Sequence, residues 1–281
     1  MGKNYLGNTN LKGKGQKFNW TKKRLKEYLK CAEDPIYFAE EYIKIVHVDH
    51  GLIPIKMYEY QKEITNLITD NRRVTVVTSR QAGKTTVAAA VILHYVLFNE
   101  HKLIALLANK GDSAREILDR IKIAYEALPK WLQQGVVEWN KGSVEFENGS
   151  KIVAAATSSS AIRGKSVSFL YIDEAAFVEN WEEFSSAVLP TISSGKTTKT
   201  LYTSTPNGLN HFHKTCSGAK EGTNGFKFVE VPWQKVPGRD AEWKQETLAA
   251  MDFDTQKFAQ EYSCQFLGSS NTLIDGGKLK T

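Results

Sequence analysis

"VTVVTSRQAGKTT", residues 74–86, runs from valines and threonines straight into a Gly-Lys-Thr step. A phosphate-binding loop follows the pattern G-x-x-x-x-G-K-[ST], and Thr78 stands here where its first glycine would be. The β-branched residues favour a strand, and residues 84–98 are apolar on nearly every side, which predicts a buried helix. Backbone N–H groups at such a junction bind phosphate. Because Gly83 is kept where the backbone must approach phosphate, we interpret the stretch as a nucleotide-binding loop that tolerates Thr78.

This loop contains the groups that a nucleoside triphosphate requires. Lys84 can reach the β and γ phosphates, and the Thr85 hydroxyl can bind Mg²⁺. We therefore predict ATP and Mg²⁺ as cofactors. The residues predicted to contact ATP here are Ser79, Arg80, Gln81, Ala82, Gly83, Lys84, Thr85 and Thr86.

A second stretch, "FLYIDEA" at 169–175, delivers two acids to the end of an apolar run. Adjacent carboxylates at the end of a buried strand are costly unless something pairs with them, and Mg²⁺ is a suitable partner for the first. We expect Asp173 to hold the water shell of the metal. Glu174, on the opposite side of the pleat, would orient and deprotonate an attacking water, so the two stretches together predict hydrolysis.

Apolar runs alternate with helical patterns along most of the chain, which predicts an α/β fold: a mostly parallel sheet of the P-loop type with helices on both faces. Asn148-Gly149 between two alternating runs predicts a hairpin, and Ser113 with Glu116 predicts a helix capping box. The expected strands are 73–79, 102–109, 143–157 (the hairpin), 167–175 and 196–206. The expected helices are two within 21–46, interrupted at Pro35, then 58–68, 84–98, 112–128 and two Trp- and Gln-rich segments after Pro232.

These patterns divide the chain into four parts. Residues 1–19 lack an apolar period and are expected to form a flexible basic arm. Residues 20–232 form the ATPase domain, 233–268 a small helical lid or linker, and 269–281 the start of a linker.

Composition limits the classes of protein to which the chain can belong. With 41% hydrophobic and 24% charged residues the chain is expected to be globular, and it has no apolar run long enough for a membrane span. Three widely spaced cysteines predict reduced, buried thiols, and "HVDH" at 47–50 is interpreted as turn chemistry and not a metal site. The net charge is +6, and residues 1–30 hold nine Lys or Arg against one acid. That end either binds a polyanion or is simply solvated.

Three stretches taken together, "TSRQAGKTT" (78–86), "FLYIDEA" and "LYTSTPNG" (201–208), closely resemble the ATPase motifs of the large terminase subunit. This is the DNA-packaging motor of tailed bacteriophages, and the resemblance is nearest to its contractile-tailed, T4-like branch. It extends from about Pro35 to Leu273 and includes "YEYQ" (58–61), "AIRG" (161–164) and "FAQEYSCQFLG" (258–268).

The resemblance implies further roles. Arg80 would meet the charge that builds on the γ phosphate in cis, or else be a surface ion-pair residue. Arg163 resembles an arginine finger offered to a neighbouring subunit, with a structural ion pair as the alternative. Gln61 would read the adenine edge, unless it is a solvated helix residue. The motif that senses loss of the γ phosphate would comprise Thr203, Ser204 and Thr205, which could also be ordinary strand residues.

The resemblance also implies partners: double-stranded DNA, the portal protein of the procapsid and the small terminase subunit. A homo-oligomeric ring is expected when the protein is docked, a monomer in isolation being left open, and the location is the host cytoplasm, with no membrane partner. No nuclease activity is expected, because the chain stops where that domain would begin. Two alternatives remain: a two-lobed helicase or DNA translocase, for which about 75 residues after 208 leave no second lobe, and an ATP-gated assembly protein, against which Glu174 argues.

Overall fold

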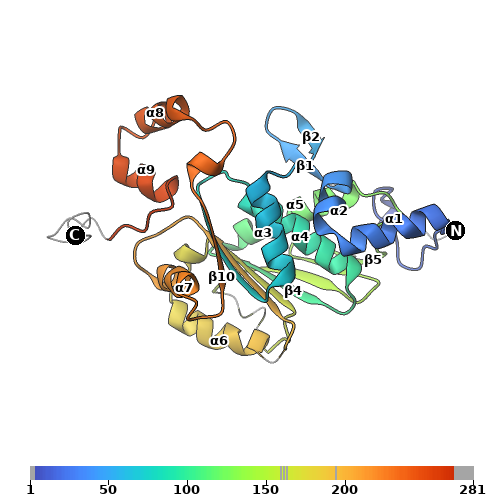
Figure 1. Ribbon diagram of the computed structural model, residues 1–281. Helices are drawn as coiled ribbons and strands as arrows, with labels where there is room; N and C mark the ends of the chain where they lie inside the picture. The colour runs from blue at the N-terminus through green and yellow to red at the C-terminus, as the bar shows by residue number, and fades with distance from the viewer. Residues whose placement is uncertain (1–3, 159, 161, 163, 194, 269–281) are drawn as a thin grey trace.

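The computed structural model describes residues 4–158, 160, 162, 164–193 and 195–268, and it is built on one eight-stranded sheet (Figure 1). The strand order is β10-β3-β9-β8-β4-β7-β6-β5, parallel from β10 to β7 and antiparallel from β7 to β5. The strands in that order are β10 (Lys227–Val231), β3 (Arg73–Thr78), β9 (Lys199–Ser204), β8 (Phe169–Asp173), β4 (Leu103–Ala108), β7 (Lys151–Ala156), β6 (Ser143–Phe146) and β5 (Val136–Trp139). The predicted mostly parallel α/β fold is confirmed.

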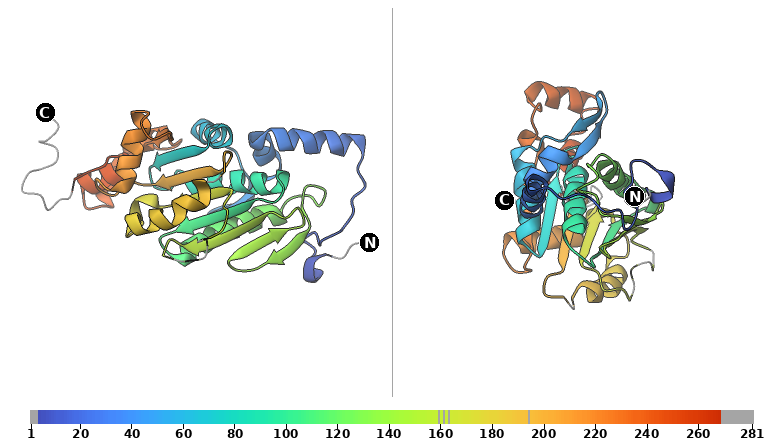
Figure 2. Two further views of the ribbon diagram at one scale, coloured as in Figure 1. Left: turned by 90° about the horizontal axis from the view of Figure 1, so that it is seen from below. Right: turned by 90° about the vertical axis from the view of Figure 1, so that its right-hand side faces the viewer.

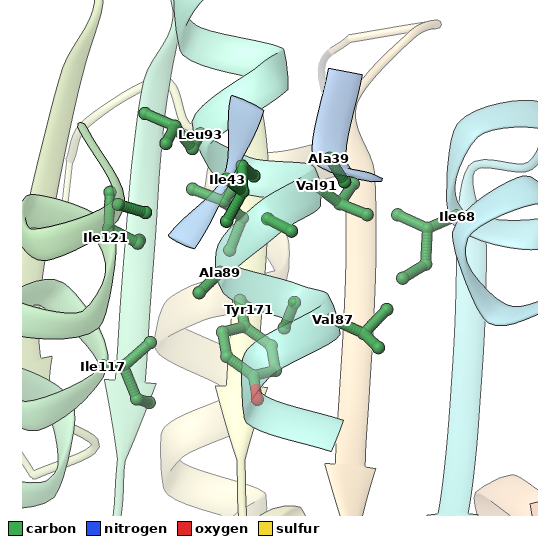
Figure 3. Close-up of a cluster of buried hydrophobic side chains, with 14 of the residues drawn as sticks. Ala39, Ile43, Ile68, Val87, Ala89, Val91, Leu93, Ile117, Ile121 and Tyr171 are labelled. Carbon is green, nitrogen blue, oxygen red and sulfur yellow. The ribbon is translucent and has the colours of Figure 1, made fainter. Parts of the chain in front are cut away.

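Helices cover both faces of this sheet. One face is covered by α1 (Lys22–Glu33), α2 (Pro35–Tyr42), α3 (Glu59–Asp70), α4 (Lys84–Phe98) and α5 (Gly111–Glu126), and the other by α6 (Trp181–Ser193) and α7 (His211–Lys220). Successive strand residues point to opposite faces. In β4, accordingly, Ile104 packs in the cluster under α4 and α5, whereas Ala105 packs in the cluster with α6. Figure 3 shows the first cluster, in which Val87, Ala89 and Tyr171 meet.

Several local predictions are confirmed. Pro35 begins α2 behind Asp34, whose carboxylate accepts hydrogen bonds from the backbone N–H groups of Ile36 and Tyr37, both at 2.9 Å. Asn148-Gly149 forms the turn between β6 and β7, with Gly149 at φ 76°. All three cysteines are free and buried. None of the described helices is both long and apolar enough to cross a membrane.

Other local predictions were wrong. Helix α5 begins at Gly111, so Ser113 lies inside its first turn, and the N-cap Lys110 makes no side-chain cap. The helix expected to reach Val46 ends at Tyr42, and the chain turns into an antiparallel hairpin of β1 (Lys44–His47) and β2 (Gly51–Pro54). The turn interpreted at 47–50 is present at its tip, where the His47 and His50 rings stack 4.8 Å apart. Within the described residues, no group of three or more His, Cys, Asp or Glu side chains is placed to hold a metal ion. The patterns also did not predict β5, β10, α6 or α7.

The first residues do not form a free arm. Leu11 is 1% exposed, in the main hydrophobic cluster. The carbonyl of Lys12 accepts a hydrogen bond from Val136 N–H at 2.7 Å, and Lys12 N–H donates to Gln133 Oε1 at 2.9 Å. Lys12 Nζ also pairs with Glu147 at 3.3 Å, and a second Glu147 oxygen accepts from Gly15 N–H at 2.9 Å. Local sequence shows no apolar period here because the segment is held by scattered contacts. Leu11 and Tyr5 pack on the main cluster, and Lys12 and Gly15 bond to residues more than 120 positions away.

After β10 the chain forms a small helical segment beside the sheet (Figures 1 and 2), and this segment carries a cluster of aromatic side chains. Its helices are a short 3-10 turn (Trp233–Lys235), α8 (Ala241–Ala249) and α9 (Thr255–Glu261). The cluster consists of the rings of Trp233, Trp243, Phe258 and Tyr262. The predicted helices are present, and the domain boundary at 232 stays a prediction.

Candidate functional site

The loop 79–83 joins β3 to α4, as predicted. Gly83 is the N-cap of α4 at φ 74°, and a β-carbon there would lie 2.5 Å from Gln61 Nε2. A side chain at Gly83 is therefore disfavoured both by conformation and by space. Thr78, in contrast, is a buried strand residue outside the left-handed region. Glycine's freedom is not needed at Thr78, which explains why threonine is tolerated.

Lys84, at the start of α4, faces both acids of β8. Its Nζ lies 2.7 Å from Glu174 Oε1 and 4.0 Å from Asp173 Oδ1. Burial opposes the charged ammonium, but the two carboxylates outweigh it, and the pKa of Lys84 is raised. Lys84 thus offsets part of the negative charge of the two carboxylates, with Lys84 and Asp173 largely buried and Glu174 38% exposed.

Glu174 departs from the expected pleat. Strand β8 ends at Asp173, and Glu174 has φ 51° and ψ 45°, in the left-handed region. Consecutive strand residues would point to opposite faces, but this turn brings both carboxylates to Lys84. The prediction that Glu174 lies across the pleat from Asp173 was therefore wrong. A left-handed non-glycine residue costs about 1–3 kcal/mol and persists where its surroundings fix it.

Strand β9 lies between β3 and β8, so its end separates the loop from the acids. Thr203, in register with Asp173, donates to Asp173 Oδ1 at 2.7 Å and also contacts the Tyr171 hydroxyl at 3.1 Å. Ser204 donates to Glu174 Oε2 at 3.3 Å and accepts from Ala176 N–H at 3.2 Å. Thr205 is also buried. Two of the three predicted coupling residues, Thr203 and Ser204, thus contact the two carboxylates directly.

Asp173 and Thr85 provide oxygen ligands suited to a small hard cation. The Thr85 hydroxyl donates to Asp173 Oδ2 at 3.3 Å. Mg²⁺ is usually held by one or two carboxylates together with phosphate and water oxygens. The residues present therefore fit Mg²⁺, although the sequence patterns alone did not establish that they meet.

Gln61 is not solvated: it is 6% exposed, near the start of α3. Its Oε1 accepts from Tyr58 N–H at 2.9 Å, and its Nε2 donates to the Ala82 carbonyl at 3.5 Å. The Tyr60 hydroxyl donates to the same carbonyl at 3.0 Å. These contacts place the predicted adenine residue against the phosphate loop. Tyr60 was missed, although it lies inside the quoted "YEYQ".

Arg80 forms a bidentate ion pair with Glu261 of α9, at 2.6 and 3.2 Å. The contact raises the pKa of Arg80, and its side chain is 59% exposed. Arg239 approaches the loop from the same side, donating to Ser79 Oγ at 2.9 Å and to the Arg80 carbonyl at 2.8 Å. The segment after β10 therefore holds the loop. Arg239 and Glu261 were missed, and the only signal was the Trp- and Tyr-rich composition around them.

The remaining predicted site residues contribute fewer described contacts to the site. Ser79 and Ala82 are buried, Gln81 is exposed at φ 57°, and Thr86 lies in the first turn of α4. Arg163 falls outside the described residues.

Comparisons with known proteins identify the family and support the fold. The family model described as terminase large subunit, T4likevirus-type, N-terminal, matches residues 75–281. The large terminase ATPase domain of Thermus phage P74-26 is similar at 24% identity and TM-score 0.63, over 75% of this chain and 94% of that one.

Two longer structures also match. The HK97 bacteriophage large terminase has 16% identity and TM-score 0.68, over 84% of this chain and 55% of that one. The large terminase of a thermophilic bacteriophage, in complex with ADP, has 12% identity and TM-score 0.59, over 75% of this chain and 54% of that one. This chain thus spans about half of those two proteins, and the likeness shows a shared fold.

Proposed function

This chain belongs to the T4-type family of terminase large subunits, in their N-terminal part, and on that premise we propose that it is an ATP-hydrolysing motor domain. The motor moves double-stranded DNA into a procapsid. The observation that carries the proposal is the contact of Lys84 with Asp173 and Glu174 at the start of α4. A phosphate-binding ammonium and two carboxylates meet there at the end of a phosphate loop.

The chain's own residues divide the work of hydrolysis. Backbone N–H groups of the loop and Lys84 bind the β and γ phosphates, which replace the carboxylates around the ammonium. Glu174, released from Lys84, orients the attacking water and accepts its proton. Thr203 and Ser204 hold the carboxylates in place, and their hydroxyls sense the loss of the γ phosphate. Gln61 contacts the adenine edge.

Thr85 and Asp173 would hold Mg²⁺, which supplies charge neutralisation between the β and γ phosphates. Arg80, once it leaves Glu261, stabilises charge on the transferring phosphoryl group in cis. Arg163 performs that task in trans, on the nucleotide of a neighbouring subunit in a ring.

The partners follow from the same premise. They are duplex DNA, the portal protein of the procapsid and the small terminase subunit, and the motor works in the host cytoplasm while docked on the procapsid.

Steady-state phosphate release by the purified chain, with and without duplex DNA and the portal, tests this function. We expect Mg²⁺-dependent hydrolysis that duplex and portal together accelerate. If the rate is the same with and without duplex DNA and portal, the chain is an ATPase but its hydrolysis is not coupled to DNA. Nucleotide binding without any hydrolysis would support an ATP-gated assembly protein instead.

A further inference from the structure

The excess of positive over negative charge in this protein lies at one end of the chain. Residues 1–30 contain nine Lys or Arg and one acid, whereas residues 31–281 contain 28 Lys or Arg and 30 acids. The chain after residue 30 is therefore slightly acidic as a whole. Any protein that holds a polyanion through many cations has to use a region of net positive charge.

This basic end is fixed on the fold. Leu11 packs in the main hydrophobic cluster, Lys12 bonds to β5 and Gly15 to Glu147, and α1 packs its Cys31 side into the core. In Figures 1 and 2, α1 lies at the end of the molecule opposite α8 and α9, the helices next to the phosphate loop. The backbone that carries these charges is thus held on the fold and lies away from the nucleotide site.

Five exposed lysines of this end form one set, which we name the basic platform; Lys30, also exposed, lies over the Tyr37 ring and is not included. Its members are Lys14, Lys17, Lys22, Lys23 and Lys26. None of them forms an ion pair with a carboxylate in the described part of the chain. The acid of this end, Glu27, has Oε1 occupied by the hydroxyls of Tyr37 and Tyr42, at 2.7 and 2.8 Å, on the α2 side.

The arrangement opposes helix stability. Three cations and no acid occupy the first turn of α1, where the helix dipole favours acids. Lys22 and Lys26, four residues apart, are like charges on one side of the helix, with Lys30 following in the same row. A sequence selected for helix stability alone would not place cations there, which favours an anionic ligand as their purpose.

We propose that the basic platform is the surface that holds duplex DNA, through backbone phosphates and without reading sequence. The proposal rests on the proposed function, which supplies the duplex. Helix α1 has 12 residues, so it is about 18 Å long, a length over which each DNA strand carries about five phosphates. Lysine suits this contact because it is a point charge on a flexible stem and makes no base-specific fork.

The test is fluorescence anisotropy of a mixed-sequence duplex of 30 base pairs, which is roughly three helical turns. The duplex is titrated with the full chain at salt concentrations from about 50 to 200 mM. The platform variant is Lys22→Gln/Lys23→Gln/Lys26→Gln, because glutamine has nearly the helix propensity of lysine. The control variant is Lys196→Gln/Lys227→Gln/Lys257→Gln, three exposed lysines elsewhere. Basal ATP hydrolysis, measured without DNA, should be unchanged in both variants and reports that each is folded.

We expect the platform variant to lose at least tenfold in affinity at the lowest salt. The slope of log Kobs against log salt should fall by about 0.9 for each lysine that contacts a phosphate, and hence by up to roughly 3 in the triple variant. The control variant should keep the wild-type slope.

Equal binding by the platform and control variants would overturn the platform while leaving the DNA motor intact. Failure of the wild-type chain itself to bind duplex would instead refute the proposed DNA substrate, and the platform with it. Trp20, Leu25 and Leu29 are half-exposed beside the lysines, so binding to phosphatidylserine vesicles is measured in parallel. Vesicle binding that the platform variant loses, with duplex binding unchanged, would reassign the surface to a membrane and overturn the proposal.

Discussion

Lys84 Nζ lies 2.7 Å from Glu174 Oε1, so the ammonium proposed to bind phosphate and the carboxylate proposed to activate water neutralise each other in this structure. Phosphates that reach Lys84 must displace Glu174. Binding of ATP therefore both seats the nucleotide and frees the base, since one contact serves both purposes. The arrangement links the presence of the γ phosphate to the availability of Glu174.

Replacement of Arg80 by alanine tests its role on the γ phosphate. Loss of a charge-stabilising arginine from a phosphoryl-transfer site typically costs about 10³–10⁵ in rate, so turnover of Arg80→Ala should fall by at least about 10³ with ATP affinity changed much less. Arg115→Ala, on the surface of α5, is the control. An effect confined to affinity or to stability would make the ion pair with Glu261 the only role of Arg80.

Arg163 is expected to act between subunits, and mixing inactive chains tests this. Glu174→Gln and Arg163→Ala chains, combined on the portal, would form some interfaces that join an intact Glu174 to an intact Arg163. Those interfaces should regain hydrolysis. No recovery in a ring shown independently to assemble contradicts action in trans.

Substitution of Leu11 tests the anchoring of the N-terminal segment. Leu11 is 1% exposed, and Leu→Ala at buried positions lowers the free energy of unfolding by about 2–5 kcal/mol. Leu6, 90% exposed, is the matched control, and Leu6→Ala should change it by less than about 0.5 kcal/mol. Urea denaturation measures both. Equal stability of the two variants would mean that the segment is not anchored in solution.

Stability should fall in alkali because of the buried thiols. Burial raises the pKa of Cys31, Cys216 and Cys264 to about 12 from 9.0. A thiol with a raised pKa in the folded state stabilises the fold fully below the unfolded pKa, and this contribution is lost as the pH rises toward the folded value. The urea midpoint should therefore decline above about pH 9, and a Cys→Ala triple variant should decline less. An identical pH dependence of variant and wild type would exclude the thiols as its cause.

Elements with strong local signals were predictable from sequence. The apolar runs of β3, β4 and β8 are buried on both faces, so their pattern is continuous, and Asn148-Gly149 specifies its own turn. Edge strand β10 spans only five positions and shows no regular alternation of apolar and polar residues, and α6 contains Pro190, which argues against a helix. These local signals were weak, and tertiary packing determined the secondary structure of both segments.

The site residues likewise divide into those that local motifs predict and those that only the fold brings together. Lys84, Thr85, Asp173 and Glu174 lie in motifs whose spacing indicates their chemistry. The contacts of Arg239 with Ser79 and of Glu261 with Arg80 join residues 160 and 181 positions apart. Only the fold brings them together, so no local pattern could predict them. The left-handed turn at Glu174 is likewise fixed by its surroundings and not by a glycine signal.

Single-turnover ATP hydrolysis with Mg²⁺, compared between wild type, Glu174→Gln and Glu179→Gln, tests the central claim most directly. Glu179 is an exposed acid five positions further along the chain, so the same substitution there controls for loss of charge. We expect the rate of Glu174→Gln to fall by about 10²–10⁴, as for loss of a general base, with ATP still bound, and Glu179→Gln to match wild type. Hydrolysis by Glu174→Gln at the wild-type rate would contradict the assignment of this site as the catalytic centre.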